Sequence, residues 1–172
     1  LLRSGADGRS IVARQALAAL GQPKALELWS KLLDVPCAQV LLAYDDLQNR
    51  RRFNNARNTL RELLAQGALP VVNENDSVAV DELRVGDNDN LAAHVAVLVE
   101  ADLLVVLSDV AGLYDADPRT NPQARLLESV ERIDEGVLAL AGGTGSEVGT
   151  GGMRTKLEAA QKATARGIPA AI

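Results

Sequence analysis

Short aliphatic runs alternate along the chain with longer segments of helix-forming residues. Stretches that are apolar at helical spacing predict helices, and brief runs of Val, Leu and Ile predict buried strands. Helices are expected in five segments: residues 11–28, 44–66, 91–99, 133–140 and 153–166. Strands are expected in four segments: residues 38–42, 69–72, 103–107 and 168–172. This alternation predicts an α/β protein in which a parallel sheet is flanked by helices.

Glycine, proline and polar residues predict where these elements stop. Gly21-Gln22-Pro23 is expected to interrupt the first helix, and Gly67 to cap the end of the second. Residues 103–107 form the clearest candidate for a buried strand. The segment after it, residues 108–123, is rich in Asp, Pro, Gly and Asn and predicts an ordered loop.

The composition narrows the class of protein. The chain has 172 residues, of which 47% are hydrophobic but only 2% aromatic, so the core is expected to be aliphatic, as in sheets buried between helices. The net charge of −5 is mixed along the chain and provides no basic surface for nucleic acid. The single cysteine, Cys37, excludes an intrachain disulfide and suits a reducing compartment. No leader pattern or membrane-length apolar run is present, so we expect a cytoplasmic protein without membrane partners.

One glycine-rich segment has the chemistry of an anion site. Residues 149–156 read Gly-Thr-Gly-Gly-Met-Arg-Thr-Lys and lead directly into a predicted helix. A glycine-rich turn at a helix start presents free backbone N–H groups and a partial positive charge, and Lys156 adds a full charge. This combination predicts a polyphosphate site, although the spacing differs from that of the P-loop.

Polar clusters follow two of the predicted strands. Asn73-Glu74-Asn75-Asp76 and Ser108-Asp109 come directly after their strands, at the edge where ligands bind in open α/β sheets, and are expected to face one crevice. A third cluster, Gly86-Asp87-Asn88-Asp89-Asn90, precedes a helix. One of its residues is needed as a cap, and the others suit an amino-acid ligand, nearby lysines or a magnesium ion. The alternative interpretation is that these residues only make turns and caps.

The remaining candidates favour packing over catalysis. The chain has one histidine, His94, within a nearly all-apolar helix, and one cysteine. A zinc site or a Cys/His nucleophile pair is therefore not expected, and no protein-held metal site is predicted. Tyr114 in the loop after the third strand suits either packing or contact with a nucleotide base.

Taken in order, these motifs resemble the amino acid kinase superfamily over nearly the whole chain. The resemblance runs through six segments: residues 4–6, 73–76, 86–90, 108–109, 112–119 and 149–156. It is closest to the branch that uses ATP to phosphorylate the γ-carboxylate of L-glutamate, the first step of proline biosynthesis. It implies a three-layer αβα sandwich with a mainly parallel central sheet, ATP and Mg²⁺ as cofactors, a homo-oligomer and possible feedback inhibition by proline.

The resemblance also implies residue roles. Three residues would bind glutamate: Ser4, Asp76 and Asn88. Lys156 would act in catalysis, and Asp89 would orient the catalytic lysines. Nine residues would contact the nucleotide: Ser108, Asp109, Thr150, Gly151, Gly152, Met153, Arg154, Thr155 and Lys156.

The chain departs from that pattern in three places. The family begins with a strand, a catalytic lysine and a glycine-rich turn, which do not precede Leu1. Only residues 7–10 separate the Ser-Gly-Ala motif from the first helix, where the family has a longer stretch. The family's last strands do not follow Ile172. We therefore expect residues 1–172 to be an amino acid kinase domain without its N-terminal lysine segment and C-terminal strands.

Three other functions compete with this one. A kinase for acetylglutamate or aspartate would share the fold, and a non-catalytic nucleotide-binding module would fit the missing N-terminal lysine. A dinucleotide-dependent oxidoreductase is disfavoured, because no Gly-x-Gly-x-x-Gly motif follows a first strand.

Overall fold

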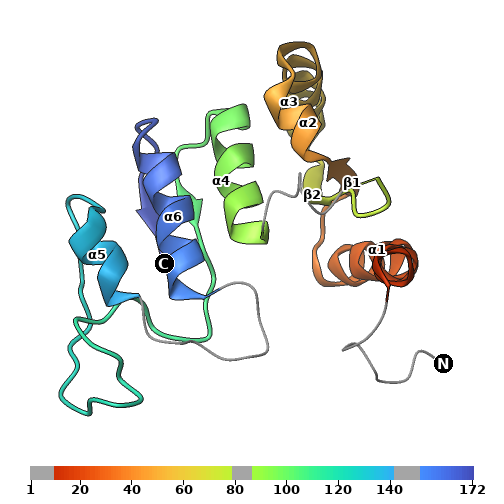
Figure 1. The fold of residues 1–172 in the computed structure, drawn as a ribbon. Helices are drawn as coiled ribbons and strands as arrows, with labels where there is room; N and C mark the ends of the chain where they lie inside the picture. The colour runs from red at the N-terminus through yellow and green to blue at the C-terminus, as the bar shows by residue number, and fades with distance from the viewer. Residues whose placement is uncertain (1–9, 79–86, 142–151) are drawn as a thin grey trace. The chain divides into compact units, whose positions relative to one another are not determined.

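The computed structural model describes residues 10–78, 87–141 and 152–172. The chain divides into two compact units, one ending at Arg84 and the other beginning at Val85. Figure 1 shows their helices and strands in chain order by colour.

The first unit contains a β–α–β arrangement preceded by a long helix. Its elements are α1 (Ile11–Leu32), β1 (Cys37–Leu42), α2 (Tyr44–Gln48), α3 (Arg50–Ala65) and β2 (Leu69–Glu74). Strands β1 and β2 pair in parallel, with Cys37 opposite Leu69 and Leu42 opposite Glu74. Helix α1 contacts β1, and α3 contacts β2. The carboxyl ends of both strands therefore lie at one edge, which β2 leaves toward Asp76.

The interruption predicted in the first helix is wrong. Helix α1 runs unbroken for 22 residues with Pro23 inside it, and Ser10 caps its start by accepting a hydrogen bond from the Ala13 N–H at 3.3 Å. A proline removes one backbone hydrogen bond and strains the preceding turn. Alanine- and leucine-rich turns on both sides have high helix propensity and offset that loss.

The second predicted helix is divided in two. Asn49 has extended backbone angles, and its side-chain oxygen accepts hydrogen bonds from the N–H groups of Arg51 and Arg52 at 3.0 and 3.2 Å. These bonds satisfy the first donors of α3, so a new helix begins there. The predicted stop is confirmed, since Gly67 follows α3 with φ of +74°, a conformation that glycine adopts without strain.

The second unit packs two helices on a short parallel strand pair. Its elements are α4 (Asn88–Val99), β3 (Leu104–Val105), α5 (Glu135–Leu140), α6 (Met153–Thr164) and β4 (Ala170–Ala171). Leu104 pairs with Ala170 and Val105 with Ala171. Parallel strands joined through helices place the chain in the α/β class. No helix in the described segments is long and apolar enough to cross a membrane.

Helices α4 and α6 lie side by side (Figure 1). Buried alanines are prominent in the core that they share: Ala93 and Ala96 come from α4, and Ala159 and Ala163 from α6. Alanine has almost no side chain to separate two helix backbones, so it permits a close approach. Side chains at the start of one helix can therefore reach the other.

The buried strand predicted at residues 103–107 is shorter and more exposed than expected. Only Leu104 and Val105 pair with a neighbouring strand. Leu104 and Val106 are buried, whereas the side chains between and beside them are exposed, with Leu107 reaching 85%. One face of this segment therefore belongs to the core described here. The polar loop that follows is ordered, as predicted: Asp117 accepts hydrogen bonds from the backbone and guanidinium of Arg119.

Leu98 tests the core of the second unit. Its side chain is completely buried, so Leu98→Ala removes apolar contact and leaves a cavity. We expect a loss of about 2–5 kcal/mol in the free energy of unfolding, measured by chemical denaturation. Leu107→Ala is the matched control and should change stability by less than about 0.5 kcal/mol. Equal losses in the two variants would contradict this description of the core.

Candidate functional site

The first turns of α4 and α6 are joined by an ion pair. The Lys156 ammonium lies 3.2 Å from each carboxylate oxygen of Asp89, although the two residues are 67 positions apart. Their side chains are only 13% and 15% exposed. A charge so far removed from water is costly unless it is paired, so each group stabilises the other.

Thr155 adds a second contact to the same carboxylate. Its hydroxyl lies 3.0 Å from an oxygen of Asp89 and 2.8 Å from the Gly152 carbonyl oxygen. A hydroxyl carries one proton, so it donates to one of these acceptors at a time. Two consecutive residues of α6 therefore hold Asp89. An ammonium has three donors, so Lys156 can bind this carboxylate and still donate to another anion.

The start of α6 has the geometry of an anion site. Gly152 is the N-cap residue of α6. Because glycine has no side chain, no capping bond from it occupies the first-turn N–H groups. These N–H groups and the positive end of the helix dipole favour a negatively charged ligand. With Lys156 in the same turn, this end of α6 combines backbone donors with a side-chain cation.

The remaining residues predicted to contact the nucleotide have varied surroundings. Met153 packs against a cluster of buried leucines that includes Leu157, and Arg154 forms an exposed ion pair with Glu158 at 3.0 Å. Thr150 and Gly151 lie outside the described residues, as does Ser4, which was predicted to bind glutamate. Their roles stay predictions.

Ser108 and Asp109 follow β3 in the same unit. The Ser108 hydroxyl accepts a weak hydrogen bond from the Val110 N–H at 3.4 Å. The pKa of Arg119 is raised, mainly by its hydrogen bond to Asp117 and by the negative charge of Asp117. The charge of Asp109 makes a smaller contribution. These groups form a polar corner after the strand, where a nucleotide is predicted to bind.

The first turn of α4 contains the helix cap that the sequence predicts and a contact with α6 that it does not. Asp87 caps the helix by accepting from the Asn90 backbone N–H at 2.7 Å, and its second oxygen accepts from the Asn90 amide at 3.3 Å. The Asn90 side-chain oxygen in turn accepts from the Lys162 ammonium of α6. The spacing Asp-x-x-Asn signals the cap, but no motif signals the contact with Lys162. Asn88, at the first position of this helix, is exposed.

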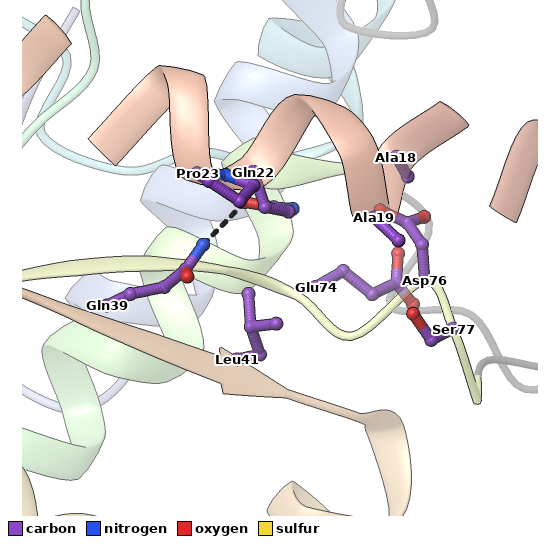
Figure 2. Close-up of a pocket in the computed structure, with 9 residues that line it drawn as sticks. All are labelled: Ala18, Ala19, Gln22, Pro23, Gln39, Leu41, Glu74, Asp76 and Ser77. Carbon is purple, nitrogen blue, oxygen red and sulfur yellow. Dashed lines mark hydrogen bonds between the residues drawn. The ribbon is translucent and has the colours of Figure 1, made fainter. Parts of the chain in front are cut away.

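A separate pocket of about 170 Å³ lies within the first unit (Figure 2). Helix α1 forms one wall and the strands the other, and nine residues line it: Ala18, Ala19, Gln22, Pro23, Gln39, Leu41, Glu74, Asp76 and Ser77. Gln39 donates to Gln22 across it at 3.1 Å.

This pocket is acidic. Glu74 and Asp76 both line it, and the nine described lining residues include neither lysine nor arginine. Within the described segments the half-buried Asp76 carboxylate has no hydrogen bond or ion pair. The two carboxylates favour a ligand that carries an ammonium group. The small volume favours a small ligand, because pockets for drug-sized ligands are about 300–1,000 Å³.

The profile of the "Amino acid kinase family" matches residues 3–172. The chain therefore belongs to the amino acid kinase family. It is 62% identical over 168 residues to "Glutamate 5-kinase" from Xanthomonas campestris pv. campestris (strain 8004), an alignment that covers 98% of this chain and 46% of that protein. It is also 63% identical over 161 residues to "Glutamate 5-kinase" from Salinibacter ruber (strain DSM 13855 / M31), with coverage of 94% and 43%. The chain thus spans about half the length of the curated relatives it matches.

His94 provides a test of the α4–α6 contact through pH. Burial, together with the positive charge of Lys162, lowers the pKa of His94 below its ordinary value of 6.5. Protonation then favours the unfolded chain, which binds the proton more tightly. The stability that the protein has while His94 is neutral is fully present above pH 6.5. It is lost as the pH falls through the lowered pKa of His94. We expect thermal unfolding scans to show this loss.

The control is His94→Gln, which removes the titrating group. The variant should lose less stability than the parent as the pH falls from about 7.5 to about 5. Identical pH dependence in the two proteins would show that His94 is not protonated differently in the folded and unfolded states.

Proposed function

We propose that the protein containing this chain transfers the γ-phosphoryl group of ATP to the γ-carboxylate of L-glutamate, giving γ-glutamyl phosphate and ADP. The observation that carries the proposal is the Lys156–Asp89 pair between the first turns of α6 and α4, in a chain that is 60–65% identical to the proteins named "Glutamate 5-kinase" in three genera. This reaction begins proline biosynthesis.

The reaction suits a site without a general base. The glutamate carboxylate has an ordinary pKa of about 4.3, so it is ionised at neutral pH and is already a nucleophile. One of its oxygens forms a bond to the γ-phosphorus while the bond from that phosphorus to the bridging oxygen of ADP breaks. The protein must align two anions and neutralise charge on the transferring group.

Lys156 and the first-turn N–H groups of α6 supply that neutralisation. Asp89 holds the ammonium in place rather than taking part in bond making. Three groups remain assigned to the nucleotide by position: Ser108, Asp109 and the segment from Thr150 to Thr155. In this assignment the corner after β3 receives the nucleoside and the helix start receives the phosphates.

Magnesium fits this arrangement as a partner of ATP. The described residues contain no group of three His, Cys, Asp or Glu side chains placed to hold an ion by themselves. Mg²⁺ is commonly bound through substrate phosphates with one or two carboxylates, and Asp109 is a carboxylate in the proposed nucleotide region. The ion would offset negative charge on the β- and γ-phosphates.

Asp76 is assigned to the ammonium group of glutamate. Its half-buried carboxylate lines the acidic pocket, where a cation is the favoured ligand (Figure 2). The described residues that line the pocket include neither lysine nor arginine, so the carboxylates of glutamate need donors from other groups. The family resemblance assigns Ser4 and Asn88, whose side chain is exposed, to glutamate as well.

Further parts of the proposal follow from family membership. We assign the chain to a three-layer αβα sandwich with a mainly parallel sheet, in a cytoplasmic homo-oligomer that proline inhibits. Native mass measurement and inhibition assays on the full-length protein test the last two assignments.

Lys156→Ala tests the phosphate role. Removing one placed charge-stabilising donor should lower kcat by roughly 100- to 1,000-fold in an assay of glutamate-dependent ADP release. Lys31→Ala, which removes an exposed lysine from α1, should leave kcat within about twofold. Near-normal turnover of a folded Lys156→Ala protein would refute the phosphate role.

Asp76→Ala tests the assignment of the ammonium site. Loss of a charged hydrogen-bond partner should raise the KM for glutamate by roughly 10- to 100-fold and leave the KM for ATP nearly unchanged. Asp34→Ala removes an exposed carboxylate from the same unit and serves as the control. Initial rates that show the same glutamate requirement in both variants would remove Asp76 from the site.

A further inference from the structure

In the segments that the structure describes, Asn90 is the one polar residue that is buried, at 8% exposure. Burying an amide is unfavourable unless its donors and acceptor find partners. Asn90 donates from its amide nitrogen to Asp87 and accepts at its oxygen from Lys162. It therefore uses both ends of the side chain, one within α4 and the other across to α6.

The position of this residue connects it to the proposed site. Asn90 follows Asp89 directly, so the two share the first turn of α4. Helix α6 contacts that turn twice: Lys156 and Thr155 bind Asp89, and Lys162 binds Asn90. Lys156 and Lys162 are six residues apart, which corresponds to roughly 9 Å along a helix. The contact between Asp89 and Lys156 alone would allow the turn to rotate about it. The second contact, between Asn90 and Lys162, fixes the orientation of the turn.

We propose that Asn90 is a positioning residue for phosphoryl transfer, because its side-chain amide joins Asp87 to Lys162 and so holds Asp89 against Lys156. The inference rests on the proposed function. Asn90 itself need not touch either substrate, and its effect passes through the ammonium of Lys156. Lys162 is the outer anchor of this arrangement; its side chain is largely exposed, and only its ammonium reaches the buried amide.

Asparagine suits this position because its side chain supplies both a donor for Asp87 and an acceptor for Lys162. Aspartate would keep the acceptor for Lys162 but would turn a carboxylate toward Asp87, with no donor between them. Leucine has nearly the same size but can make neither bond. For Lys162, arginine keeps a donor at the end of a long side chain, whereas methionine removes it.

The experiment measures kcat and both KM values for the full-length protein and its variants by glutamate-dependent ADP release. Asn90→Leu should lower kcat by roughly 10- to 100-fold, the range expected when a catalytic group is displaced by about 1 Å, with each KM changed by less than about threefold. Lys162→Met should lower kcat in the same direction but less, and Lys162→Arg should restore it.

A second measurement separates positioning from general stability. In a Lys156→Ala background, Asn90→Leu should lower the melting temperature but cause no further loss of kcat beyond about twofold, because the group it positions is gone. Gln161→Met is the control on α6: Gln161 donates to the Ile133 carbonyl at 2.7 Å, in a contact remote from Asp89 in sequence. It should change stability and leave kcat unchanged.

The outcomes are distinct. An Asn90→Leu protein with normal kcat, or one whose kcat loss adds fully to that of Lys156→Ala, overturns the positioning role while the proposed function stands. An equal kcat loss in Gln161→Met overturns it as well, since any loss of packing would then suffice. A parent protein that releases no ADP with glutamate overturns both proposals.

Discussion

The pairing of Lys156 with Asp89 is the interaction on which the second unit depends. It joins two helices whose first turns carry most of the proposed chemistry, and it lies largely out of contact with water. Removing one member of such a pair leaves an uncompensated charge, which typically costs about 3–5 kcal/mol. The pair exists because small side chains bring α4 and α6 together: Ala93 and Ala159, each almost completely buried, occupy the shared core. Packing therefore determines where the charges meet.

The same pair limits what Lys156 can do alone. Its charge is balanced by Asp89, so the unliganded end of α6 carries little net charge from side chains. Under the proposed function, the attraction for a polyphosphate would come from the first-turn N–H groups, the helix dipole and a metal ion that arrives with the nucleotide. In the proposed reaction, Asp89 would fix the direction of the ammonium and so lower the reorganisation that phosphoryl transfer requires. The arrangement favours precise placement over strong electrostatic attraction.

The sequence predicted the class of fold and most elements, because hydrophobic periodicity reports burial directly. The sequence-based prediction failed where contacts with neighbouring residues determine whether a helix ends or continues. Asn49 is one polar residue in a helical stretch, and only its capping bonds show that one helix ends there and another begins. Pro23 suggested a break that the surrounding turns overcome. In the site, residue types indicated Lys156, whereas a partner 67 positions away was suggested by family resemblance and not by spacing. The bond between Asn90 and Lys162 follows no motif, since helix packing alone brings these side chains together.

The charge of the pocket in the first unit bears on the choice of substrate under the proposed function. In the first unit, Glu74 and Asp76 line a pocket with no cationic residue among its described walls (Figure 2). Such a pocket attracts a free ammonium and repels carboxylates. Acetylglutamate has a neutral amide in place of that ammonium, so it gains nothing there and still brings two carboxylates. Glutamate and aspartate both retain the ammonium, and they differ in the length of the side chain that carries the second carboxylate. Under the proposed function, in which Asp76 binds the substrate ammonium, this pocket favours an unmodified amino acid over acetylglutamate.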